Sequence, residues 1–176
     1  MNFKEPFTTF PFTKIINEQN IEIGHHCQFD DFVFIDGGVY TLIGDYVHIA
    51  TFASVLGGGK LYVGSFTTLS SGCRVYTGTD NFDGSTLCGA PVPAPFRKPI
   101  RGEVHIGKHA LVGANAVILP GAAICEGTVI AAGAVVLANQ LCKAWTIYAG
   151  VPAKAVKSRP YAEMDELERQ LRAGEE

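Results

Sequence analysis

Residues 106–141 read IGKHAL, VGANAV, ILPGAA, ICEGTV, IAAGAV and VLANQL in consecutive steps of six. Each step opens with an aliphatic residue. The fifth position of the first five steps is small: Ala110, Ala116, Ala122, Thr128 and Ala134. Only the last step departs, with Gln140. A fixed short period of this kind indicates a solenoid in which each repeat is one structural unit.

The same period continues through the first half of the chain. Further steps open at Ile23, Phe29, Ile35, Ile43, Ile49, Val55, Val63, Leu69 and Val75. Ile23, Ile43 and Val63 are 20 residues apart, whereas Ile106 and Ile124 are 18 apart. Three steps therefore make one coil, and the early coils carry two extra residues at one corner.

The physical reason for the pattern lies in the geometry of short extended segments. Their alternate residues point inward, so the opening aliphatic residue fills the interior. The fifth position must be small where three faces converge on a narrow axis, and glycine supplies the backbone angles of the corners. Between Ile21 and Val156 no helical stretch of about 10–15 residues appears, as an α/β fold would require. We predict an all-β fold, a three-sided parallel β-helix.

Three segments depart from the period. Residues 77–104 hold four of the nine prolines, and we expect a protruding loop of functional importance rather than a linker. Residues 160–172 have apolar side chains at helical spacing, which predicts a helix that caps the open end or packs on a neighbour. The expected boundaries are an N-terminal cap at 1–20, the β-helix at 21–157 and a C-terminal helix at 158–176.

Composition restricts the class of protein. The 176 residues fit one domain, and a net charge of −3 gives no reason to expect a nucleic-acid or membrane partner. The N-terminus lacks the apolar stretch of a secretion signal, and no apolar run is long enough to span a membrane. The five cysteines lack CxxC spacing. We therefore expect a cytoplasmic protein with reduced thiols.

The segment IGKHALVGANAVILPGAAICEGTVIAAGAVV, followed by YAGVPAKAVKSR, resembles the hexapeptide-repeat acyltransferases. The resemblance extends over roughly Ile21 to Arg159. It implies left-handed coiling and acetyl-CoA or another acyl-CoA as co-substrate, with no required metal. It also implies a homotrimer with active sites at the subunit interfaces.

Within this family, the O-acetyltransferases carry a catalytic histidine at or next to the start of the inserted loop. Here the loop starts TDNFDG, with Asp80 or Asn81 where that histidine would fall. This segment, the proline-rich insert and WTIYAGVPAK are similar to the nucleotide-sugar N-acyltransferases of the family. The resemblance favours N-acylation of an amino group on a nucleotide-linked deoxysugar. The alternative is O-acetylation of a sugar or surface-glycan hydroxyl.

Four residues near the loop are candidates for catalysis. A carboxylate that orients an amine and accepts its proton can suffice, and Asp80 and Asp83 are placed to do so. Asn81 would be a hydrogen-bond partner, although all three residue types also favour turns. His109 is the fourth residue of its step and should point outward. It is either a surface residue or a residue that acts as base or holds the thioester carbonyl.

The family resemblance also implies the CoA contacts. Matching them to this chain gives Ala114 and Ala132 for the pantetheine arm and Lys154 and Lys157 for the phosphates. The alternatives are corner packing for the alanines and a solvated basic tail for the lysines. A backbone N–H near Gly113 and Ala114 is expected to stabilise the oxyanion.

Two further features leave alternatives open. Trp145 either covers the adenine or acyl end of the cofactor or packs against the last coil. Four cations near the loop are candidates to bind a substrate diphosphate, because arginine binds phosphate oxygens bidentately. They are Arg74, Arg97, Lys98 and Arg101.

Two other classes share the repeat. A γ-class carbonic anhydrase needs three converging histidines, whereas His105 and His109 are four residues apart with no third histidine in the adjacent coils. A catalytically inactive solenoid that serves as a scaffold would be distinguished by its failure to bind acyl-CoA.

Overall fold

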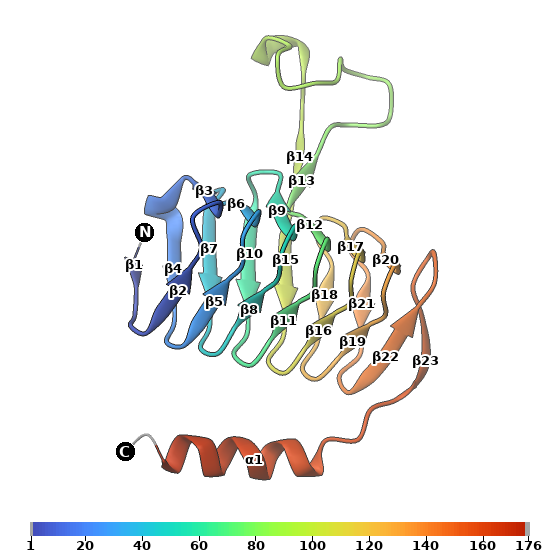
Figure 1. Cartoon of the computed structure of the whole chain (residues 1–176). Coiled ribbons are helices and arrows are strands. Elements are labelled where there is room, and N and C mark those ends of the chain that lie inside the picture. Colours follow the sequence, from blue (N-terminus) through green and yellow to red (C-terminus); the bar gives the residue numbers. More distant parts are fainter. Residues whose placement is uncertain (1, 175–176) are drawn as a thin grey trace.

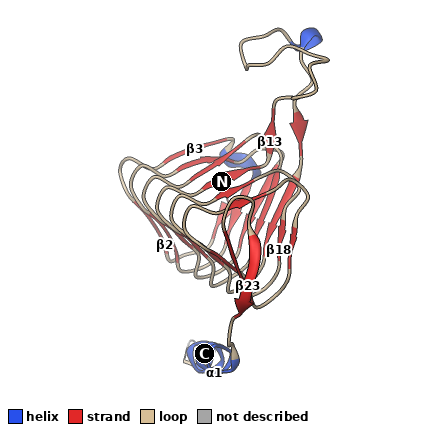
Figure 2. Cartoon of the chain, turned by 90° about the vertical axis from the view of Figure 1, so that its right-hand side faces the viewer, coloured by secondary structure: helices blue, strands red, loops and turns tan. Residues whose placement is uncertain are grey.

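The computed structural model describes residues 2–174. The backbone winds through about seven coils of a left-handed parallel β-helix with a triangular cross-section (Figures 1 and 2). Equivalent strands of successive coils lie in register, so each flat side of the prism is a parallel sheet. The predicted fold class is confirmed.

The first face has seven strands, each hydrogen-bonded to its equivalent in the next coil. They are β1 (Asn2–Phe3), β4 (Ile21–Ile23), β7 (Tyr40–Ile43), β10 (Lys60–Val63), β15 (Glu103–Ile106), β18 (Ala123–Ile124) and β21 (Leu141–Cys142).

The second face has eight strands, the last of which runs antiparallel to the rest. They are β2 (Phe7–Thr9), β5 (Cys27–Phe29), β8 (His48–Ile49), β11 (Thr68–Leu69), β16 (Leu111–Val112), β19 (Val129–Ile130), β22 (Thr146–Ala149) and β23 (Lys154–Ser158). The third face has six strands. They are β3 (Lys14–Ile16), β6 (Phe34–Asp36), β9 (Ser54–Leu56), β12 (Arg74–Tyr76), β17 (Val117–Ile118) and β20 (Val135–Val136).

The interior follows the six-residue period of the sequence. The opening residues of the steps from Ile106 to Val136 are all buried, and so are the five small residues at the fifth positions. Each buried aliphatic side chain contributes about 1.5–3 kcal/mol to stability. Ala122 is fully buried, so a leucine there would overpack the axis at a cost of about 1–3 kcal/mol.

Three edges separate the faces, and each has its own character. The helix edge joins the first and second faces, and the C-terminal helix α1 (Ala162–Ala173) lies along it (Figures 1 and 2). The loop edge joins the third and first faces, where the inserted loop leaves the prism. We call the remaining edge, between the second and third faces, the open edge.

The N-terminal segment is the first coil rather than a separate cap. Its strands β1, β2 and β3 pair in register with β4, β5 and β6. Phe7 and Ile15 pack against the core. The one-turn 3₁₀ helix η1 (Glu18–Asn20) interrupts the six-residue period between the first two coils, at the expected end of the cap.

Helix α1 does not cover the end of the prism. It runs back along the helix edge from the last coil, with Arg172 reaching Asp45 of the third coil (Figure 1). The last coil is instead followed by β23, which folds back antiparallel onto β22. The apolar side chains at helical spacing therefore face the side of the same chain's solenoid.

The inserted loop stands away from the prism (Figure 1). Its two ends form a short antiparallel ribbon of β13 (Gly78–Thr79) and β14 (Ile100–Arg101). Beyond the ribbon the chain has one further element, the 3₁₀ turn η2 (Ala94–Phe96). The proline-rich segment is thus an excursion from one corner, between β12 and β15, as the break in the period predicts.

Candidate active site

The carboxylates of the loop have different surroundings. Asp80 is half-buried, and its Oδ2 accepts a hydrogen bond from the Gly89 N–H at 3.0 Å. Asp83 is exposed and accepts from the Ser85 N–H at 2.7 Å, while Asn81 accepts from the Asp83 N–H at 3.2 Å. Hydrogen bonds from Ser85, and then from Asn81, hold the pKa of Asp83 below its ordinary value. Asp83 and Asn81 therefore make a local turn, whereas Asp80 is the more buried of the two carboxylates.

A cavity of about 540 Å³ lies where the loop joins the prism. Its walls come from the loop base and from the next two coils at the same edge. They include Phe82, Ile100, Arg101, Leu119, Pro120 and Asn139. The cavity is mostly apolar, with one cation, and neither predicted carboxylate lines it.

The predicted pantetheine contacts lie on the open edge, away from the loop. Gly113 and Ala114 follow β16, and Ala132 occupies the position of Ala114 one coil later. A side chain at Gly113 would approach the Ala132 backbone nitrogen to 2.6 Å, so glycine is required for the coils to stack. Lys154 lies opposite Ala149 at the open-edge end of β22, whereas Lys157 lies opposite Ile147, nearer the helix edge.

The backbone N–H groups of this edge are not equally available. The Gly113 N–H donates to the Ile130 carbonyl oxygen at 2.7 Å, so it is not free to hold an oxyanion. Among residues 2–174, no acceptor pairs with the Ala114 N–H. Of the two predicted donors, Ala114 alone keeps an unused N–H.

His109 points out of the prism as predicted, but it is not a surface residue. It is only 4% exposed, because helix α1 covers it on the helix edge. Its ring stacks on Phe66 at 5.2 Å between centroids. The structure thus places His109 on a different edge from both the loop and the predicted CoA groove.

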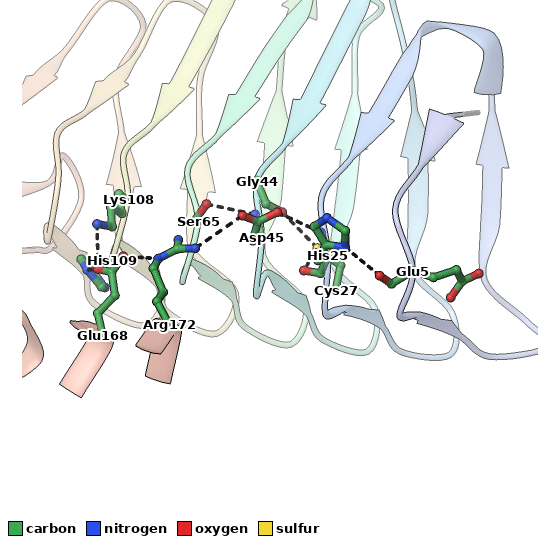
Figure 3. Close-up of polar contacts among 10 residues, drawn as sticks. All are labelled: Glu5, His25, Cys27, Gly44, Asp45, Ser65, Lys108, His109, Glu168 and Arg172. Carbon is green, nitrogen blue, oxygen red and sulfur yellow. Dashed lines mark hydrogen bonds and ion pairs between the residues drawn. The ribbon is translucent and has the colours of Figure 1, made fainter. Parts of the chain in front are cut away.

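A charged cluster fixes α1 above His109 (Figure 3). Glu168 Oε2 lies 2.7 Å from Lys108 Nζ and 2.8 Å from His109 Nε2, and Oε1 accepts from Arg172 Nε at 2.9 Å. Burial opposes ionisation of Glu168, but the hydrogen bonds from Lys108, Arg172 and His109 outweigh it and lower its pKa to about 2. This geometry attaches the helix to the solenoid.

Trp145 belongs to the same helix edge. Its ring stacks on Tyr161 at 4.6 Å, tilts over His109 at 6.1 Å and lies 5.9 Å from the Arg159 guanidinium carbon. The packing interpretation of Trp145 fits these contacts, since Ala114 and Ala132 lie on the open edge. Within one chain the tryptophan and the predicted pantetheine groove are on different edges.

The four cations do not form one group. Arg74 folds toward the open edge, where its Nη1 donates to the carbonyl oxygens of Phe52, Gly72 and Cys73. Arg101 lines the cavity at the loop base. Arg97 and Lys98 follow η2 on the loop itself.

The described residues give no support for covalent catalysis by a buried cysteine, for a metal site or for a membrane span. Burial raises the pKa of the Cys27 and Cys142 thiols to about 11 and of Cys73 to about 12, so none of these is an activated nucleophile. In the described part of the chain, no group of three His, Cys, Asp or Glu side chains is arranged to hold a metal ion. Within residues 2–174 we also find no helix with the length and apolarity needed to cross a membrane.

Comparison with known proteins agrees with this architecture. The family model "Bacterial transferase hexapeptide (six repeats)" matches residues 103–138. The dTDP-4-amino-4,6-dideoxy-D-glucose acyltransferase of Escherichia coli is 33% identical over 141 residues, which cover 80% of this chain and 72% of that protein. The chain belongs to the hexapeptide-repeat acyltransferases.

Solved structures of this acyltransferase family extend the match over nearly the whole chain. AntD, an N-acyltransferase from Bacillus cereus, in complex with dTDP and 3-hydroxybutyryl-CoA superimposes with a TM-score of 0.89 at 29% identity, over 98% of this chain and 90% of that one. A variant of AntD in complex with dTDP-4-amino-4,6-dideoxyglucose and coenzyme A gives a TM-score of 0.87 at 31% identity, over 96% and 88% of the two chains.

The sequence analysis did not predict that aromatic side chains form continuous rows along two of the edges. On the helix edge, His26, Tyr46, Phe66, His109 and Trp145 all have positive φ and form a row of rings. On the open edge, Phe12, Phe32 and Phe52 form another row. The signal was present, because Phe12, Phe32 and Phe52 are spaced by 20 residues, as are His26, Tyr46 and Phe66.

Proposed function

We propose that this acyltransferase transfers an acyl group from acyl-CoA to the amino group of a nucleotide-linked amino deoxysugar. The observation that carries the proposal is the 33% identity, over four-fifths of the chain, to an enzyme named for acylating dTDP-4-amino-4,6-dideoxyglucose. The match to AntD supports it, because AntD is an N-acyltransferase that binds both dTDP and acyl-CoA. O-acetylation of a sugar hydroxyl is the competing reaction.

A pair of residues supports a catalytic role for Asp80. The solved AntD variants replace a serine and an aspartate that are ten positions apart. In this chain, Ser70 and Asp80 are the one serine–aspartate pair with that spacing. Ser70 lies on the open edge, one coil before Gly113, and its hydroxyl has no hydrogen-bond partner among residues 2–174. We assign Ser70 and Asp80 to the site.

The reaction is a single displacement. The acceptor amine attacks the thioester carbonyl carbon and Asp80 accepts the amine proton. The C–S bond then breaks, and Asp80 returns the proton to the departing CoA thiolate, which leaves as a thiol. The Ala114 N–H and the Ser70 hydroxyl are placed to stabilise the oxyanion of the tetrahedral intermediate. Ala132 borders the pantetheine arm, and Lys154 and Lys157 contact phosphates at the nucleotide end of the cofactor.

The proposed site needs more than one copy of the chain. Asp80 belongs to the loop edge, whereas Ser70 and Ala114 lie on the open edge, and the third face separates them (Figure 2). A protruding loop that reaches the open edge of a neighbour would join the two halves. In a closed ring of three copies each chain makes this contact with the next, so no interface is left unpaired. We therefore propose a homotrimer with interfacial active sites, acting in the cytoplasm.

An assay of CoA thiol release tests the proposed function. Purified enzyme is mixed with acetyl-CoA or 3-hydroxybutyryl-CoA and dTDP-4-amino-4,6-dideoxyglucose, and thiol release is followed. Asp80→Asn is expected to lower kcat/KM by about 10²–10⁴, the usual contribution of a general base. Asp83→Asn, which alters only the turn, is expected to have less than about a tenfold effect. Turnover restricted to hydroxyl acceptors such as dTDP-glucose would favour the O-acetyl alternative.

A further inference from the structure

The open edge carries an exposed row of three phenylalanine rings. Phe12 and Phe32 stack at 5.3 Å between centroids with 4° between their planes, and Phe32 and Phe52 stack at 5.2 Å with 14°. The three side chains are 64%, 52% and 56% exposed. Large apolar side chains gathered in this way on a surface indicate a binding site.

The row ends at a place without a side chain. The strand register makes Gly72 the equivalent of Phe52 in the next coil. The nearest group to where a Cβ at Gly72 would begin is the Asn115 carboxamide, whose oxygen would lie 2.2 Å from it. On the helix edge the corresponding glycine, Gly127, is covered by the Trp145 ring. One ring face of Phe52 therefore points toward a position that the chain does not fill with a ring of its own.

A guanidinium lies beside that position. Nη1 of Arg74 donates to the carbonyl oxygens of Phe52 and Gly72, which holds the side chain against this part of the edge. The Nε and Nη2 groups of Arg74 have no acceptor among residues 2–174. Two free N–H groups of one guanidinium suit a phosphate, which they bind in a bidentate manner.

We infer that Phe52 and Arg74 form the nucleotide subsite of the acceptor, with the base stacked on Phe52 and the diphosphate on Arg74. This inference rests on the proposed function, since it assumes a nucleotide-linked acceptor. The position of this subsite agrees with the proposed reaction centre, because Gly72, at the end of the phenylalanine row, is only two residues from Ser70. The base would lie beyond the reaction centre, and the sugar amine would point toward the thioester.

The arginine favours a nucleotide over other occupants of the phenylalanine row. An acyl chain carries no charge, so it would cover the rings and leave the Arg74 N–H groups without a partner. A contact between copies through the row would bury the same unpaired N–H groups, which is unfavourable. A base with an attached diphosphate satisfies the ring and the cation together.

Direct binding of dTDP, measured by calorimetry without acyl-CoA, tests the subsite. Phe52→Ala is expected to weaken dTDP at least about tenfold, as loss of one stacked base does, and to leave inorganic pyrophosphate unaffected. Arg74→Gln is expected to weaken both ligands. Phe12→Ala, two coils away in the same row, is the matched control and should bind dTDP like the native enzyme. Thermal unfolding of each variant shows whether it is folded.

A second variant adds a ring at the end of the row, which requires the Asn115 carboxamide to turn aside. In Gly72→Phe the new ring would take the place of the base, with a backbone conformation that Phe32 and Phe52 already adopt at φ values of 61° and 62°. We expect the KM for the amino sugar to rise at least tenfold and the KM for acyl-CoA to stay the same. Native dTDP affinity in both Phe52→Ala and Gly72→Phe would overturn the subsite.

Two further results would identify a different role for the phenylalanine row or a failure of the proposed function alone. A changed sedimentation coefficient of Phe52→Ala with unchanged dTDP affinity would show that the row joins subunits, and would also overturn the subsite. If the native enzyme binds dTDP through Phe52 but acylates no amino sugar, the subsite stands and the proposed function fails.

Discussion

The helix edge and the open edge each carry a row of aromatic residues, but helix α1 covers part of the first row and leaves the second uncovered. On the helix edge the rings of Phe66 and His109 lie against α1, and Arg172 lies over Phe66 at 5.0 Å. On the open edge the phenylalanine rings contact one another and remain more than half exposed. Both rows rest on the same coils, so the interior does not decide their roles. What lies outside each edge does.

The difference should be largest when a ring is removed from each row. Phe66→Ala is expected to lower the free energy of unfolding by about 3 kcal/mol, because the ring packs among Tyr46, His109 and α1. Phe32→Ala should cost about 1 kcal/mol or less, since its ring is half exposed. Both positions have similar positive φ, at 59° and 61°, so backbone strain is matched. Denaturant unfolding measures both, and equal losses would contradict the comparison.

Two glycines sharpen the same contrast. Gly127 and Gly133 have φ of 65° and 69°, so alanine is similarly strained at each, at roughly 1 kcal/mol. A Cβ at Gly127 would lie 2.2 Å from the Trp145 ring, whereas a Cβ at Gly133 would have no atom of residues 2–174 within 4 Å beyond its chain neighbours. Gly127→Ala should therefore cost about 1–3 kcal/mol more than Gly133→Ala in thermal unfolding. A smaller loss at Gly127 would mean that the tryptophan moves freely.

The charged cluster provides a smaller effect. Glu168→Gln should reduce stability by about 1–2 kcal/mol, because Lys108, His109 and Arg172 lose a charged acceptor. The matched control is Glu166→Gln, on the same helix, whose side chain is 49% exposed and pairs with Arg169; it should change stability by less than about 0.5 kcal/mol. Trp145 is the single tryptophan, so its emission reports displacement of α1. Unchanged emission and stability in Glu168→Gln would rule out the attachment.

The smallest expected effect concerns how the stability of the protein depends on pH. Glu168 has a pKa of about 2 in the folded protein against an ordinary 4.5, so its contribution to stability is present above pH 4.5 and is lost as the pH falls toward 2. Helix α1 should loosen over that interval in the native chain. Glu168→Gln should lack this component of the acid transition, which Trp145 emission against pH would record. Superimposable acid transitions in the two proteins would contradict the assignment.

The sequence predicts the inside of this molecule better than its outside. Aliphatic residues at positions like Ile118, and small residues at positions like Ala122, recur in successive coils because each coil encloses a similar interior volume. This recurrence is visible in the sequence. The side of the solenoid on which α1 lies depends on individual contacts, such as Glu168 with His109, which are 59 residues apart. No local pattern encodes such a pair, so His109 was expected at the surface.

The candidate site shows the same division. The loop and the groove alanines were found because one breaks the period and the others match a family motif. Ser70 and Arg74 were not assigned together, because their significance comes from the corner they share with Gly72 and Ala114. Residues that share a corner recur at the coil period, so alignment of successive coils can group them from the sequence.

The in-register coils give every edge a fixed length scale. Neighbouring strands are about 4.8 Å apart, so equivalent positions are separated by whole multiples of that distance. Phe52 and Ala132 are three coils apart on the open edge, roughly 14 Å along the axis. A chain of this kind can change the length of ligand it accommodates only in discrete increments, by gaining or losing an entire coil. Intermediate lengths must be met by the inserted loop, whose conformation the coil register does not determine.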